Sequence, residues 1–127
     1  MRLVILLALA VTVVSAQEQP SAQDVFQKNC VKCHAGPKAP NRLELTDYAG
    51  VMRGGKSGRA IVNGDAKTSL LYLAIVGVAS HVPQMPPWAP LTWKEIFAIR
   101  RFIDGGATKD LFVERFIMVD MSGRAVP

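Results

Sequence analysis

Residues 29–36 read NCVKCHAG, and Cys30 and Cys33 are the only two cysteines in the chain. Two residues separate them and His34 follows directly, which gives the pattern C-x-x-C-H. This pattern is typical of c-type haem attachment, in which both thiols add to the vinyl groups of one porphyrin and the histidine is the proximal iron ligand. The stretch therefore predicts one covalently bound haem c, attached through Cys30 and Cys33, with His34 bound to the iron.

Two other chemistries use the same residue types. A thioredoxin-like C-x-x-C pair begins a helix after a strand, whereas here the pair ends an expected helix over about residues 22–30. A structural zinc site needs four ligands, and besides the two cysteines and His34 only His81 remains as a fourth. A metal-binding module without haem is therefore a third interpretation, after an electron carrier and a haem protein with an open iron site.

The second axial position of the iron decides the function of a haem protein. Methionine at that position gives a saturated electron carrier, whereas an open position permits ligand binding or catalysis. Met85 lies in VPQMPPW, residues 82–88, where three prolines hold the backbone extended. We therefore expect Met85 to be the distal iron ligand. His81 is the competing ligand, and Met52 ranks third.

The rest of the chain has mainly helical patterns. Helices are expected over about residues 22–30, for one or two turns after Thr46, over residues 66–76 and over residues 93–104. The last of these has the clearest boundaries, because Thr92 and Glu95 form a capping box and Gly105 and Gly106 follow its end.

Aromatic residues mark the packing of the last helix and the pattern of the tail. Trp93, Phe97 and Phe102 are expected to pack that helix onto the first one. The tail, residues 110–127, is rich in Phe, Val and Ile, which predicts a short strand with a turn at Ser122 and Gly123.

The N-terminus has the layout of a secretory signal peptide. One positive charge precedes an apolar run over residues 3–16, and small residues stand before a polar break. The fourteen residues of this run are fewer than the ~20 needed to cross a bilayer. We therefore expect cleavage after Ala16 and a periplasmic protein that is not an integral membrane protein. The remaining length of about 110 residues predicts one small domain.

The chain has a net charge of +5 at pH 7, and basic residues cluster near the cysteine motif and at a glycine-rich loop, residues 54–65. The residues concerned are Lys28, Lys32, Lys38, Arg53, Lys56 and Arg59. They form either a solvated face or a docking patch for an acidic redox partner. Nucleic-acid binding has no further support, because no aromatic interleaving or recognition helix accompanies the charge.

The glycine-rich loop also matches a nucleotide-binding pattern. Gly50, Gly55, Lys56 and Ser57 fit G-x-x-x-x-G-K-S, but a phosphate-binding loop needs a preceding strand and a following helix. Residues 58–65 contain an Asn-Gly break instead, so we expect no nucleotide site and interpret the glycines as allowing close approach of the backbone to the haem. No carboxylate pair or serine-histidine arrangement predicts an enzyme.

Three stretches together resemble the small planctomycete-type cytochrome c domain, a branch of the class I c-type cytochromes. They are VFQKNCVKCHAGPKAPNRLELTDYAG (25–50), GGKSGRAIVNGDAKTSLLYLAIVG (54–77) and MPPWAPLTWKEIFAIRRFIDGGA (85–107). The resemblance implies an all-α class I cytochrome c fold wrapped around one covalently bound haem, with crossed N- and C-terminal helices. It also implies haem attachment at Cys30 and Cys33, a proximal His34 and a distal Met85.

The resemblance and the terminal patterns together give the expected organisation and function. A signal peptide (1–16) precedes the cytochrome c domain (17–107), and a C-terminal extension (108–127) of unknown role, with a short β tail, follows it. The predicted function is an exported carrier of single electrons between redox partners. The alternative is a haem protein with an open or displaceable sixth site that acts as a ligand-binding or catalytic subunit.

Overall fold

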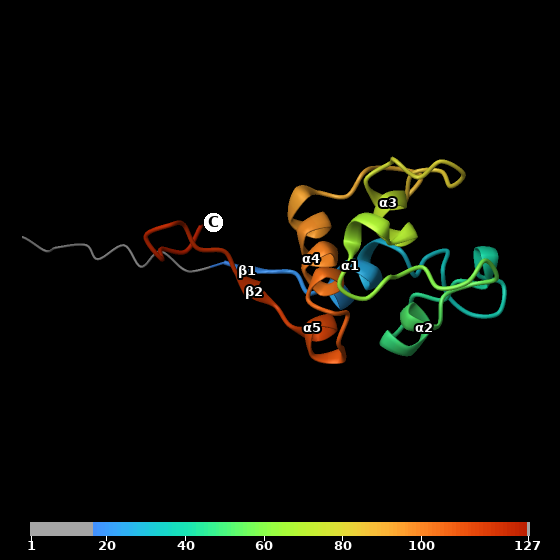
Figure 1. Cartoon of the computed structure of the whole chain (residues 1–127), viewed down its shortest axis with the longest axis horizontal. Helices are drawn as coiled ribbons and strands as arrows, with labels where there is room; N and C mark the ends of the chain where they lie inside the picture. Colours follow the sequence, from blue (N-terminus) through green and yellow to red (C-terminus); the bar gives the residue numbers. More distant parts are fainter. Residues whose placement is uncertain (1–16, 127) are drawn as a thin grey trace, which may run out of the picture.

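The computed structural model describes residues 17–126, and the predicted signal peptide over residues 1–16 lies outside them. The described part is mostly helical with a small two-stranded sheet (Figure 1). The elements, with η for short 3-10 helices, are β1 (Glu18–Gln19), α1 (Ala22–Asn29), η1 (Pro40–Arg42), α2 (Tyr48–Arg53), η2 (Ala66–Thr68), α3 (Leu70–Ile75), α4 (Trp93–Asp104), α5 (Lys109–Val113) and β2 (Phe116–Ile117). Among these helices, none is long and apolar enough to span a membrane.

Helices α1 and α4 pack against each other, and both begin with a capping box. In α1, the Ser21 hydroxyl accepts from the Asp24 amide at 3.1 Å, and the Asp24 carboxylate accepts from the Ser21 amide at 3.0 Å. In α4, Thr92 and Glu95 make the equivalent pair at 3.3 and 2.9 Å, which confirms the predicted cap. These caps satisfy amide groups that the first helical turn leaves without partners.

The single helix expected over residues 66–76 is divided into η2 and α3. Ser69 separates them with an extended backbone, and its buried hydroxyl accepts from the Val62 amide at 2.9 Å and donates to the Asp65 carbonyl at 2.7 Å. Side chain to backbone hydrogen bonds of this kind compete with a continuous helix. The prediction of a helix was right for α3, and the hydroxyl of Ser69 explains the interruption.

The buried face of α4 differs from the predicted aromatic face. Phe102 is fully buried in the core, but Trp93 and Phe97 are 57 and 41 % exposed, so the expectation that they pack onto the first helix was wrong. Phe97 instead contacts Phe116 of β2, with ring centroids 5.4 Å apart. Its partner is therefore the C-terminal tail, which lies beside α4.

The tail begins with a helix and then forms the predicted short strand. The Thr108 hydroxyl caps α5 by accepting from the Leu111 amide at 3.3 Å, so the first part of the tail is helical rather than extended. β2 then pairs antiparallel with β1, with Gln19 opposite Phe116 (Figure 1). The two ends of the described chain therefore lie side by side.

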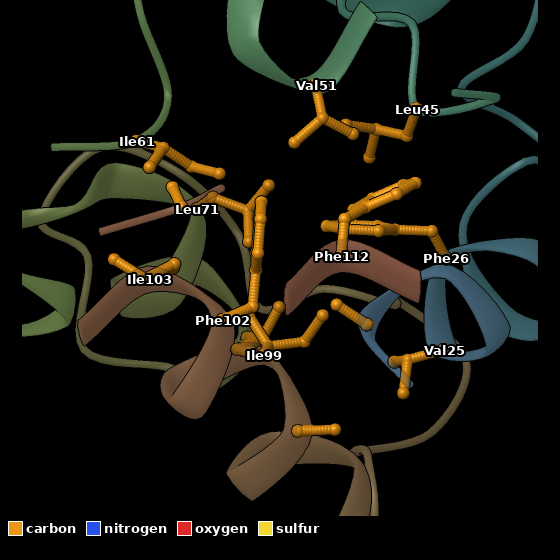
Figure 2. Packing of buried hydrophobic residues seen from close by; sticks show 14 of the residues in the cluster. Val25, Phe26, Leu45, Val51, Ile61, Leu71, Ile99, Phe102, Ile103 and Phe112 are labelled. Carbon is orange, nitrogen blue, oxygen red and sulfur yellow. The ribbon is translucent and has the colours of Figure 1, made fainter. Parts of the chain in front are cut away.

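Phe112 of α5 joins the tail to the helical core. It is 2 % exposed, and its ring stacks on Phe26 at 5.8 Å and meets the edges of Tyr48 and Phe102 at 5.7 and 5.4 Å. Figure 2 shows Phe112 facing Phe26 among the buried residues. Arg115 adds an exposed ion pair with Asp24 of α1 at 2.9 Å. Residues 109–117 thus share a core with the residues before them.

We expect Phe112→Ala to lower the free energy of unfolding by about 3–5 kcal/mol, because it removes a buried aromatic ring and leaves a cavity. Urea unfolding of the purified protein measures the change. Val113→Ala, at a neighbouring position that is 53 % exposed, is the matched control and should change stability by less than about 0.5 kcal/mol. Equal effects of the two substitutions would show that α5 does not stabilise the core.

Candidate functional site

A cavity of about 500 Å³ lies between the C-terminal part of α1, the buried face of α3, the glycine-rich loop and the proline-rich segment before α4. Its volume is within the range of roughly 300–1,000 Å³ that small-molecule and cofactor sites occupy. Most of its wall is apolar. The wall also contains five of the six residues that the sequence proposed for haem attachment or iron binding, namely Cys30, Cys33, His34, Met85 and His81.

The imidazole of His34 is held in one tautomer. Its Nδ1 atom lies 3.0 Å from the carbonyl oxygen of Leu43, and a carbonyl oxygen can only accept a hydrogen bond. Nδ1 therefore carries the proton, and Nε2 keeps the lone pair that a metal ion requires. The backbone of His34 is also bound on both sides, to the Cys30 carbonyl at 2.9 Å and the Leu45 amide at 2.8 Å.

The two cysteines lie at the end of α1 and in the turn that follows. Cys30 is the C-cap residue, and the Cys33 amide donates to the Cys30 carbonyl at 3.2 Å. Burial, together with the negative charge of Glu95, raises the pKa of the Cys30 thiol to about 11. Zinc sites and thiol redox pairs use thiolates instead. Within residues 17–126, no group of three or more His, Cys, Asp or Glu side chains could hold a metal ion.

Met85 lies in the cavity wall, in the irregular segment between α3 and α4. A backbone hydrogen bond connects it to α3. Its amide donates to the Ala74 carbonyl at 3.0 Å, and its side chain is partly buried against the core. His81, the competing distal ligand, lines the same cavity and is exposed. Met52, the third candidate, packs against the core and is not part of the cavity wall. The structure thus brings two of the three candidates to the site.

The glycine-rich loop forms a tight turn at the edge of the cavity. Gly55 and Gly58 bond each other through both amides at 3.0 Å, and the Lys56 amide donates to the Asn41 carbonyl at 2.7 Å. A β-carbon at Gly55 would lie 2.5 Å from the Asn41 oxygen, so a larger residue does not fit there without a shift. Helix α2 rather than a strand precedes the loop, unlike a phosphate-binding loop.

The structure separates the two arginines near this loop. Arg59 lines the cavity and is the only lysine or arginine in its wall as described. Arg53 lies outside the wall and pairs with Glu44 at 3.6 Å. A carboxylate-bearing cofactor in the cavity would therefore meet the positive charge of Arg59 first.

Glu95 is a residue whose position the sequence did not reveal. Its carboxylate accepts from Lys28 at 2.8 Å, from Asn29 at 3.1 Å and from Thr92 at 2.9 Å. Burial raises the pKa of Glu95, but these hydrogen bonds outweigh it and lower the pKa to about 2. The capping box was visible in the sequence, whereas the bond across 66 positions to Asn29, beside Cys30, had no local signal.

Two cysteines, a histidine with a free Nε2 and a methionine thioether line one largely apolar cavity in a helical domain. These groups fit a covalently attached haem, and the arrangement is that of a c-type cytochrome. Residues 30–88 match the family model described as Planctomycete cytochrome C. This match supports a planctomycete-type cytochrome c domain in the chain, and that family of haem proteins implies a covalently bound haem c. Neither a curated protein nor a solved structure matches the chain.

We expect Gly55→Ala to lower the free energy of unfolding by about 1–3 kcal/mol, because the added methyl group overlaps the Asn41 carbonyl and presses on Leu43. A shift of Leu43 would also disturb the carbonyl that binds His34. Urea unfolding measures the loss. Ser57→Ala in the same exposed loop is the control and should cost less than about 0.5 kcal/mol. Equal stabilities of the two variants would show that the loop accommodates a side chain at Gly55.

Glu95 should make the protein sensitive to acid. Its pKa of about 2 in the folded protein lies below the ordinary value of 4.5, so its contribution to stability is complete above about pH 4.5 and is lost as the pH falls towards 2. Urea unfolding at several pH values should therefore show a shallower acid loss in Glu95→Gln than in the unchanged protein. Glu114→Gln, in an exposed pair with Arg101, should keep the original slope. A Glu95→Gln curve parallel to the original would contradict the expectation.

Proposed function

We propose that the protein is an exported monohaem c-type cytochrome that carries single electrons between redox partners. One observation supports this function above the others: Cys30, Cys33, His34 and Met85 line a single apolar cavity, although Met85 lies 51 positions after His34 in the sequence. We expect it to act as a carrier rather than as an enzyme.

The roles of the site residues follow from their chemistry. Cys30 and Cys33 would hold the haem through thioether bonds, and His34 Nε2 and Met85 Sδ would occupy the two axial positions. When bound, the haem supplies a reversible one-electron couple between ferric and ferrous iron. The Leu43 carbonyl orients the imidazole, and the Ala74 carbonyl holds the backbone of Met85. These two carbonyl groups would thus help to keep His34 and Met85 in place as iron ligands.

Basic residues around the cavity support docking of an acidic redox partner. Lys28 and Arg53 already pair with Glu95 and Glu44. In the part of the chain that the structure describes, no ion pair involves the exposed side chains of Lys32, Lys38, Lys56 and Arg59. Long-range attraction by such charges raises association rates and falls with added salt. We therefore expect partner association to weaken as the ionic strength rises.

Export to the periplasm is part of the same proposal. The sequence pattern of residues 1–16 supports it, and cleavage after Ala16 would leave β1 intact because β1 begins at Glu18. The domain over residues 17–107 would hold the haem, and residues 108–127 would form an extension whose first half packs on α1.

The visible spectrum of the matured protein, reduced and then exposed to carbon monoxide, tests the carrier function. A low-spin haem spectrum that carbon monoxide does not change is expected, because His34 and Met85 would supply both iron ligands that the protein can give. Met85→Ala should open one position and make the spectrum sensitive to carbon monoxide. Met52→Ala is the control and should behave like the unchanged protein.

The other outcomes separate the alternatives. A carbon monoxide shift in the unchanged protein would indicate an open or displaceable sixth site and favour the ligand-binding or catalytic function. Loss of the low-spin spectrum in His81→Ala rather than in Met85→Ala would assign the distal position to His81. The absence of any haem band would contradict both haem functions.

A further inference from the structure

Glu95 is the one charged residue within residues 17–126 that is buried. Its side chain is 8 % exposed and accepts a hydrogen bond from Asn29 across the contact between α1 and α4. Leu91 and Ile99, four residues before and after it, both line the cavity, and so does its hydrogen-bond partner Asn29. A fixed anion therefore lies directly behind the wall on the side of Cys30.

The ion pair of Glu95 is asymmetric. Its partner Lys28 keeps 71 % of its side chain exposed, so water and salt screen the positive charge. The carboxylate lies in surroundings of low dielectric constant, where a charge acts more strongly and over a longer distance. The carboxylate is close to the site, because Asn29, which donates to it at 3.1 Å, lines the cavity and directly precedes Cys30. The cavity therefore experiences a net negative field from this pair.

We propose that Glu95 lowers the reduction potential of the haem iron, and this inference rests on the proposed electron-carrier function. Reduction transfers one electron from a donor protein to the ferric iron, and no covalent bond forms or breaks. The site loses one positive charge in that step. A nearby anion stabilises the more positive ferric state and so makes reduction less favourable, whereas a nearby cation has the opposite effect.

Substitutions of the two members of the ion pair should shift the reduction potential in opposite directions. Spectroelectrochemical titration of the haem-loaded protein should give a higher potential for Glu95→Gln and a lower one for Lys28→Gln. Glutamine at position 95 can still complete the capping box with Thr92, so helix α4 keeps its start. Both substitutions break the same Lys28–Glu95 contact. A purely structural role of that contact would therefore move both potentials in the same direction.

Glu114→Gln is the charge-matched control, because it changes the net charge by the same amount in an exposed ion pair with Arg101. Its potential should stay close to that of the unchanged protein. Equal shifts in Glu114→Gln and Glu95→Gln, no shift in Glu95→Gln, or shifts of the same sign in Glu95→Gln and Lys28→Gln would each overturn the proposal. If Glu95→Gln does not fold, a lowered potential in Lys28→Gln supports it and any other result overturns it. A chain without haem overturns the proposed function instead.

Discussion

The packing of α1 against α4 is the constraint on which the site depends. Helix α1 ends at the cysteine motif, so its position on α4 determines where Cys30, Cys33 and His34 face. Asn29 and Lys28 in the last turn of α1 bind Glu95 in the first turn of α4, beside the motif. The capping boxes define where each helix begins, and this contact fixes how they lie against each other. The cavity lies between these two helices on one side and α3 with the proline-rich segment, residues 82–88, on the other.

The predictable features of the site are those encoded by neighbouring residues. The C-x-x-C-H motif, the capping box at Thr92 and the proline-rich segment around Met85 each lie within a few positions. The capping box is confirmed, and the cysteines, His34 and Met85 line the same cavity. Sequence reasoning placed Phe97 wrongly because an apolar stripe does not say which element covers it. The hydrogen bonds from Asn29 to Glu95 and from His34 to Leu43 have no periodic signal, since they depend on how the chain returns to the motif.

The tail shows the same limit of local patterns. Its apolar residues predicted a strand, but Thr108 caps a helix first, and only the residues after it pair with β1. Phe112 then fills the space between Phe26, Tyr48 and Phe102. A domain of about 110 residues has little core area, so one more buried aromatic ring is a substantial part of its stability. The tail therefore stabilises α1, and through α1 it supports the motif that ends that helix.

The charges around the cavity differ in burial, and this difference decides their influence. Arg59 is exposed at the glycine-rich edge, where water screens it, and it can meet an anionic group only at short range. Glu95, in contrast, is buried between the packed helices α1 and α4. The surrounding protein has a low dielectric constant and therefore screens its negative charge little. A cofactor between them would be oriented by contact with the first charge and biased electrically by the second. No hydrogen bond within the described residues joins the two side chains, so a substitution of Arg59 leaves the hydrogen bonds of Glu95 in place.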